Sequence, residues 1–218
     1  MSILTAMRSL AVPIAVLLIA VPSLDAQRRT PQRKPAAPPR KHEPAKVTCP
    51  EVLGLGVKTK LSFCFVLAGR DPASGVLVNI PPHTGAAILT FDLHNRHTYS
   101  EEEVKAGRGF AKYAAVIGVL TMTGDLLGRG AVASEFRRAR DLYDRITGGA
   151  GPGGVKAVAP AGRQEVTITI PPKIEQVSLL GELLESTTPG GREVASPGRP
   201  VAIVSNVQVE YQPAPPRR

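Results

Sequence analysis

Short stretches in which apolar and polar side chains alternate recur along the middle of this chain, and they constrain its fold more than any other feature. Val57, Leu61, Phe63 and Phe65, for example, all fall on one side of an extended segment. Alternation with a period of two is typical of a β-strand with one buried face. Such stretches predict about eight strands, at residues 57–67, 76–80, 87–93, 115–121, 126–134, 166–170, 177–184 and 201–211.

Turn signals separate these strands at fairly regular spacing, as in the Pro-Pro-His-Thr-Gly stretch at residues 81–85. Many short strands with regular turns are typical of a β-sandwich or a β-barrel. Residues 47–212 are numerous enough to bury a core of their own. We therefore expect a mainly β fold, a single sandwich domain over residues 47–212 that is Ig-like or jelly-roll-like.

Two segments interrupt the strand pattern with helical features. Ser100 is followed three residues later by Glu103, which is the capping-box pattern, and it predicts a helix that runs towards Tyr113. In residues 136–146 the apolar side chains recur at helical spacing and share one face. We expect this second helix to pack across a sheet edge, and the alternative is a helix that binds a partner.

The N-terminus has the three parts of a secretory signal peptide. Arg8 is the charge of a short first region, an apolar run follows over residues 9–24, and Ala26 stands where cleavage is expected. The apolar run is shorter than the about 20 residues of a spanning helix, and it contains Pro13 and Pro22. The sequence predicts a periplasmic or secreted protein with no transmembrane segment after cleavage, the alternative being a retained N-terminal anchor.

Residues 27–46 differ sharply in composition from the rest of the chain. They hold five prolines and seven basic residues against one acid, Glu43, and no large hydrophobic residue. Such a segment buries too little apolar surface to offset its ordering entropy, so we expect a disordered basic tether. Residues 213–218, which end in Arg217 and Arg218, predict a disordered tail.

The positive charge of the chain belongs mainly to these two segments. Of the formal net charge of +9, the tether carries +6 and the tail +2, so about +1 is left for the rest. A nucleic-acid-binding fold would cluster its Lys and Arg on one folded face, which argues against a nucleic-acid partner. The favoured interpretation of the basic tether is a solubilising spacer, and the alternative is that it binds an anionic cell-envelope surface.

The sequence has two cysteines, Cys49 and Cys64. In an exported chain such a pair predicts a disulfide, and closing a loop this short contributes roughly 3 kcal/mol. The pair offers too few ligands for a zinc site and too wide a spacing for CxxC redox chemistry. We therefore interpret it as a structural bond.

The densest polar cluster follows a predicted strand. Asp92, His94 and His97 lie close together, and His83 falls in the preceding turn. Imidazole and carboxylate groups bind zinc, and a histidine can act as a general base. The HxxH spacing of His94 and His97 matches no strong zinc signature, so the favoured interpretation is a hydrogen-bonded structural role.

Other catalytic signals are weak. The glycine-rich residues 148–154, followed by Lys156, lack the spacing of a phosphate-binding loop, and no GxSxG motif occurs. Aromatic residues make up only 4% of the chain and tryptophan is missing, which disfavours a sugar-stacking surface. The abundance of Ala, Gly, Arg and Pro suits a bacterium with a GC-rich genome.

Three functional hypotheses follow. The first is an exported, non-enzymatic β-sandwich protein that needs no cofactor and has a binding or structural role in the cell envelope or outside the cell. The second is a metal-dependent or histidine-assisted hydrolase centred on His83, Asp92, His94 and His97. The third is a surface-anchored protein whose work is done by the basic tether.

Overall fold

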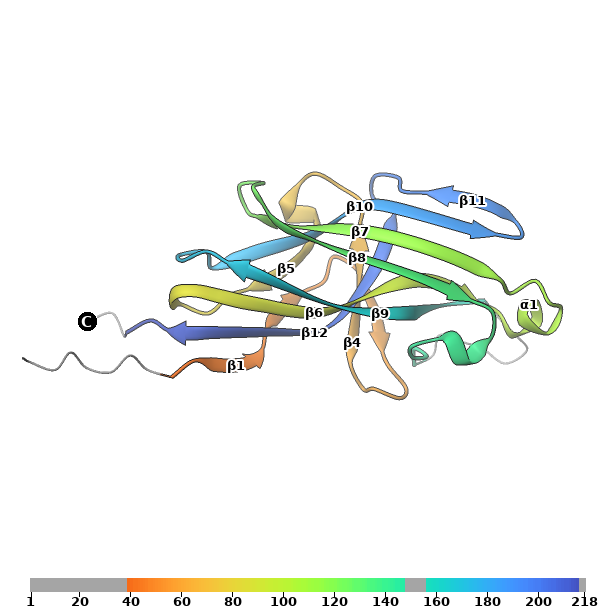
Figure 1. Cartoon of the computed structure of the whole chain (residues 1–218), viewed down its shortest axis with the longest axis horizontal. Helices are drawn as coiled ribbons and strands as arrows, with labels where there is room; N and C mark the ends of the chain where they lie inside the picture. The colour runs from red at the N-terminus through yellow and green to blue at the C-terminus, as the bar shows by residue number, and fades with distance from the viewer. Residues whose placement is uncertain (1–38, 148–155, 216–218) are drawn as a thin grey trace, which may run out of the picture. The chain divides into compact units, whose positions relative to one another are not determined.

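The computed structural model of the chain describes residues 39–147 and 156–215. In these ranges twelve strands form two sheets (Figure 1). The strands are β1 (Lys41–Pro44), β2 (Lys46–Thr48), β3 (Val52–Leu55), β4 (Ser62–Leu67), β5 (Val76–Asn79), β6 (His83–Tyr99), β7 (Ala111–Thr121), β8 (Leu126–Phe136), β9 (Ala157–Ile170), β10 (Gln176–Thr188), β11 (Gly191–Val194) and β12 (Pro200–Pro213). The signal peptide predicted for residues 1–26 lies outside the described residues.

The strands pair antiparallel throughout both sheets. The first sheet has the order β3-β4-β12-β6-β9, with β1 also paired to β12, and the second has the order β2-β5-β10-β7-β8, with β11 paired to β10. Figure 1 shows β6, β9 and β12 in one layer and β7, β8 and β10 in the other. The predicted β-sandwich class is confirmed.

The main core lies between the sheets and follows the alternation of the sequence. On β6 the fully buried side chains Leu89, Phe91 and Leu93 are spaced two residues apart, and they pack in one cluster with Ile117 of β7 and Leu179 of β10. Alternate side chains of a strand point to opposite faces, so a period of two places one set between the sheets. Each buried aliphatic or aromatic side chain of this kind contributes about 1.5–3 kcal/mol to the free energy of unfolding.

Each of the eight predicted strands has a counterpart, but two of them are much longer than expected. The strand predicted at residues 57–67 is shorter: β4 begins at Ser62, and Val57, predicted on the buried side, lies in a turn and is half exposed. The strand predicted at residues 87–93 is β6, which begins at His83 and ends at Tyr99, and the one predicted at 166–170 is β9, which begins at Ala157. The two pair with each other from Ala87 opposite Ile170 to Tyr99 opposite Ala157. Cross-strand pairing therefore extends the ladder through polar residues that interrupt the hydrophobic pattern.

A second, smaller core covers the outer face of the first sheet. We call it the outer cluster; its buried residues are Phe63, Phe65, Ile146 and Ile203. The alternation at residues 57–67 predicted a strand with one buried face. In β4 the opposite face is buried as well, because Cys64 and Val66 lie in the main core. Both faces of β4 are covered, by the second sheet on one side and by residues 137–147 on the other.

The helix predicted at residues 136–146 is wrong. Phe136 is the last residue of β8, and the segment that follows contains only the short 3₁₀ turn Ala139–Asp141. Phe136 and Ile146 then belong to different apolar clusters, so they share no helical face. The segment is held instead to the first sheet: the Tyr143 N–H donates to the Pro160 carbonyl at 3.0 Å.

The other predicted helix begins where the sequence indicates but is much shorter. It is α1 (Glu101–Lys105), and the Ser100 hydroxyl accepts from the Glu103 N–H at 3.4 Å. Gly107 follows with a φ of 72°, in the left-handed region that glycine adopts easily, and it turns the chain out of the helix. β7 begins at Ala111, so the predicted extension to Tyr113 is wrong.

The predicted disorder of residues 27–46 is wrong for its last residues, whereas residues 27–38 lie outside the described ranges. β4 pairs only with residues 200–204 of β12, and β1 continues that row by pairing with residues 208–211. The Tyr211 hydroxyl donates to Glu43 at 2.9 Å, and Arg40 forms an ion pair with Glu210. An unpaired stretch of β12 edge offers backbone partners that a composition argument does not count.

The predicted tail is also partly ordered, because β12 ends at Pro213 and the Ala214 N–H donates to the Pro82 carbonyl at 3.1 Å. Residues 216–218 lie outside the described residues.

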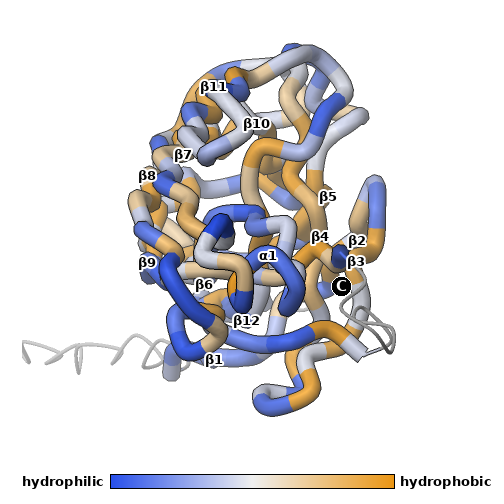
Figure 2. Tube along the Cα trace, turned by 90° about the vertical axis from the view of Figure 1, so that its right-hand side faces the viewer, coloured by the Kyte–Doolittle hydropathy of each residue, from blue (hydrophilic) through white to orange (hydrophobic). Residues whose placement is uncertain are grey.

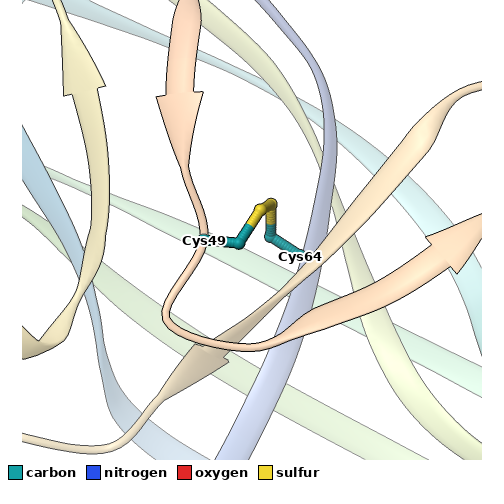
Figure 3. Close-up of a disulfide and its surroundings, with 2 residues drawn as sticks. All are labelled: Cys49 and Cys64. Atoms are coloured by element: carbon teal, nitrogen blue, oxygen red, sulfur yellow. A yellow bond between two sulfur atoms is a disulfide. The ribbon is translucent and has the colours of Figure 1, made fainter.

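The predicted disulfide is confirmed. Cys49 and Cys64 are bonded, with their Cα atoms 5.5 Å apart (Figure 3). Cys49 follows β2 of the second sheet and Cys64 lies in β4 of the first, so the bond links the two sheets near the start of the domain.

Candidate functional site

The four candidate residues of the polar cluster all lie on β6, but the strand separates them. His83 and Asp92 are nine residues apart along it, which corresponds to about 30 Å at the rise of a β-strand. His94 and His97 are an odd number of residues apart and face opposite sides of the first sheet. Within the described residues, no three His, Cys, Asp or Glu side chains are arranged to hold a metal ion.

His94 is fully buried against the outer cluster, in ring contact with Phe63 and Tyr143. Its Nδ1 donates to the Gly162 carbonyl at 2.7 Å, which leaves Nε2 to accept from the Ser205 hydroxyl at 2.9 Å. Burial lowers the pKa of His94, so the ring is neutral at physiological pH. Both ring nitrogens are therefore used within the fold.

Ser205 and His94 form a pair that the sequence did not indicate. A serine hydroxyl that donates to a histidine oriented by a second acceptor is the hydrogen-bond pattern of an activated nucleophile. Ser205 is only 1% exposed, however, and the group that orients His94 is a backbone carbonyl and not a carboxylate. A substrate carbonyl has no access to this hydroxyl in the structure, so the pair fits a structural role.

Asp92 is 1% exposed and is occupied by two other partners. Its carboxylate accepts from the Arg163 Nε at 2.9 Å and from the Asn206 side-chain amide at 3.3 Å. A buried carboxylate requires such charge-assisted bonds to offset its lost hydration. His83, at the other end of β6, hydrogen-bonds through Nδ1 to the Pro81 carbonyl at 2.9 Å.

His97 faces the interior of the sandwich, where its Nδ1 is 2.7 Å from the Tyr113 hydroxyl oxygen and its ring stacks on Phe136 with the centroids 3.8 Å apart. Burial lowers the pKa of His97 to about 4 and raises the pKa of Tyr113 to about 12. Both groups are uncharged at neutral pH. They form the inner, neutral wall of a pocket at the end of the molecule where α1 lies.

This pocket has a volume of about 460 Å³ and is lined by residues of both sheets. Residues of β6, α1, β7, β10 and β11 line it, together with Lys156 just before β9. Figure 2 views the molecule from the α1 end, where strongly hydrophilic residues surround the helix. The volume falls within the about 300–1,000 Å³ of typical small-molecule sites. We call it the α1 pocket.

Charged side chains are concentrated in the α1 pocket. Arg96 contacts Glu193 of β11 with its Nη2 atom 3.3 and 3.4 Å from the two carboxylate oxygens, and Arg108 donates to Glu103 at 3.0 and 3.3 Å. The bond to Arg108 lowers the pKa of Glu103. Lys156 makes no ion pair with any residue in the described ranges. Three cations face two carboxylates, a formal balance of +1.

A second hollow, of about 520 Å³, lies by Arg70 and Glu182 and is walled mostly by small or aliphatic residues. Glu182 is already bound to Arg129 with 2.6 Å between Oε2 and Nε. The α1 pocket is therefore the better candidate site, because it combines aromatic, hydroxyl and cationic groups. Its lining comes from segments far apart in sequence, and of its residues the sequence predicts only His97 as a site candidate.

These features define a class of protein: an antiparallel β-sandwich whose sheets are joined by a disulfide. No family model matches the sequence, and no curated protein matches it. The fold search returned an infectious bursal disease virus VP2 subviral particle (TM-score 0.25, 12% identity, 80% of this chain and 32% of that chain covered). It also returned the T13 particle of that virus (TM-score 0.20, 11% identity, 82% and 41% covered).

This chain thus covers less than half the length of either viral chain. In the part of the chain that the structure describes, no helix is long and apolar enough to cross a membrane.

Proposed function

We propose that this protein is an exported, non-enzymatic β-sandwich protein that binds a small ligand in the α1 pocket, in the periplasm or outside the cell. The observation that carries the proposal is the pocket itself, which residues of both sheets line and which contains hydrogen-bonding and charged groups. Ligand sites are typically concave, with a few polar groups among apolar ones. The N-terminal signal pattern and the Cys49–Cys64 bond support export, because disulfides persist in oxidising compartments.

The absence of catalysis is supported by how the buried polar groups are used. The side chains of Asp92, His94 and His97 each hydrogen-bond to another residue of this chain. Ser205, which hydrogen-bonds to His94, is shielded from solvent. A general base or nucleophile must reach its substrate within hydrogen-bonding distance. The geometry favours a rigid polar interior over a reaction centre.

The rival hydrolase hypothesis is tested directly on the mature protein. We expect no labelling by a fluorophosphonate probe, which reacts with activated serines, and no stoichiometric zinc in protein purified without added metal. Labelling that disappears in Ser205→Ala would contradict the proposal. Bound zinc that is lost in His94→Ala/His97→Ala would contradict it equally.

A second role rests on the basic tether, which would hold the domain to an anionic envelope surface. A truncation that tests this role must begin before β1, because residues 41–46 contribute to strands of the domain. A chain that begins at residue 39 keeps those strands and loses the four cations of residues 27–38. We expect it to leave a heparin or lipopolysaccharide column at lower salt than the mature chain; equal retention of the two chains would reduce residues 27–38 to a spacer.

A further inference from the structure

The guanidinium of Arg96 is poorly compensated for a charge that is mostly buried. Its side chain is 20% exposed, and among the described residues its guanidinium hydrogen-bonds to Glu193, through Nη2 at 3.3 and 3.4 Å. The Nε atom is buried and has no hydrogen-bond partner among the described residues. Buried cations are normally paired with short, charge-assisted bonds of about 2.7–2.9 Å. A further anion near this guanidinium would therefore be stabilised.

Glu193 is well placed to give way to such an anion. It lies on β11, a four-residue strand at the edge of the second sheet that pairs only with β10 among the described strands. Its side chain is 58% exposed, so it regains water easily when it leaves Arg96. Its contacts with Arg96, at 3.3 and 3.4 Å, are longer than strong charge-assisted bonds, so an anion that binds Arg96 more closely can replace them.

The rest of the α1 pocket is suited to an anion that carries an apolar group. Lys156 adds a cation that forms no close ion pair with a described residue, although its charge also acts on Glu103, and Phe110, Val104 and Leu184 supply apolar walls. The inner wall is the uncharged pair of His97 and Tyr113, which brings no negative charge to the site. A small organic carboxylate satisfies both halves of this lining.

We propose that the α1 pocket binds a small carboxylate with an apolar body, that Arg96 and Lys156 attract its carboxylate, and that the side chain of Glu193 occupies the carboxylate position when no ligand is bound. The inference rests on the proposed binding function and names the ligand class. The Arg96 guanidinium then contacts a carboxylate with and without ligand, because the carboxylate of the ligand takes the place of the Glu193 carboxylate. Inorganic phosphate would share the charge of the ligand but not its apolar contacts.

The probe for testing this is benzoate, titrated into the ¹⁵N-labelled mature chain and followed by amide chemical shifts. Benzamide has the same shape without the charge, benzylamine has the opposite charge, and phosphate has charge without an apolar body. We expect benzoate to shift amides that line the pocket on β6, α1 and β11, and to bind more tightly than all three comparison probes. Binding should weaken in about 0.5 M salt, where charges are screened within about 3–4 Å.

Two exposed substitutions separate the roles of the charges without risk to folding. Glu193→Gln removes the competing carboxylate and should tighten benzoate binding by about two- to fivefold, whereas Lys156→Gln should weaken it by a similar factor. Glu185→Gln is the matched control for the first, because Glu185 also pairs with an arginine, Arg192 of β11, and neither residue lines the pocket. Lys105→Gln is the control for the second, since Lys105 pairs with Glu101 and does not line the pocket.

Arg96→Lys keeps the charge but not the planar guanidinium, and we expect it to weaken benzoate binding by about tenfold or more. The outcomes are distinguishable. Equal binding of benzamide, tighter binding of benzylamine or phosphate, or no change in Glu193→Gln would overturn the carboxylate inference while the pocket remained a binding site. Chemical shifts that avoid the pocket with every probe would overturn the proposed function as well.

Discussion

His97 makes the stability of this fold sensitive to mild acid, and its partner Tyr113 allows a clean test. Burial holds the pKa of His97 at about 4, whereas an unfolded chain gives histidine a value of about 6.5. Between these values the unfolded state binds more protons than the folded state. The free energy of unfolding therefore falls as pH drops from about 6.5 to about 4, and above this window the contribution of His97 is complete.

The magnitude follows from the difference between the two pKa values. A separation of about 2.5 pH units corresponds to about 3 kcal/mol, and about 2.5 kcal/mol of it is already lost at pH 4.5. Replacing both members of the His97–Tyr113 pair with phenylalanine removes the titrating group and leaves no buried hydroxyl without a partner. Replacing both partners of a hydrogen bond by apolar groups of similar shape changes the free energy of unfolding little. At pH 7 the double variant should therefore be as stable as the natural chain.

Urea unfolding followed by circular dichroism at pH 7 and pH 4.5 measures the effect. At pH 4.5 we expect His97→Phe/Tyr113→Phe to be more stable than the natural chain by about 2 kcal/mol, a shift of about 1 M in the urea midpoint. Tyr113→Phe alone is the matched control, because it keeps His97 and with it the sensitivity to acid. His94, whose pKa is also lowered, acts equally in all three proteins. If the double variant and the natural chain lose the same stability between the two pH values, the reasoning is refuted.

Three further expectations concern the scaffold. Alanine at both cysteines should lower the free energy of unfolding by about 3 kcal/mol in urea titrations. Thiol titration of the natural protein should find no free cysteine. An unchanged urea midpoint in the double variant would show that the bond does not stabilise the fold. A chain beginning at Val47 lacks β1 and should be about 1–2 kcal/mol less stable than one beginning at residue 39, measured by thermal melting. Gly181→Ala should cost about 1–3 kcal/mol, because a Cβ there collides with the Val201 side chain, whereas Gly190→Ala, whose nearest neighbour would be 3.6 Å away, should leave the melting temperature unchanged. Equal melting temperatures within either pair of chains would contradict the corresponding packing argument.

The sequence by itself determined the features that depend on near neighbours in the chain. A period of two indicated the eight main strands, because successive side chains of a strand point to opposite faces whatever its partner is. The start of α1 at Ser100 was predicted for the same kind of reason, since the serine cap and Glu103 are only three residues apart. The Cys49–Cys64 bond followed from the small number of cysteines in an exported chain, which left one possible pairing.

Tertiary structure decided everything that depends on which segments meet. Pairing with β9 extends β6 through His94 and His97. Residues 137–147 cover the first sheet as a loop with a short 3₁₀ turn, and not as the predicted helix. The contact between Ser205 and His94 joins residues 111 positions apart. The α1 pocket likewise takes its cations from β6, from the loop after α1 and from the residue just before β9. Local patterns record which side of a strand is buried, but the free energy that selects its neighbours comes from contacts between distant residues, and these have no local signature.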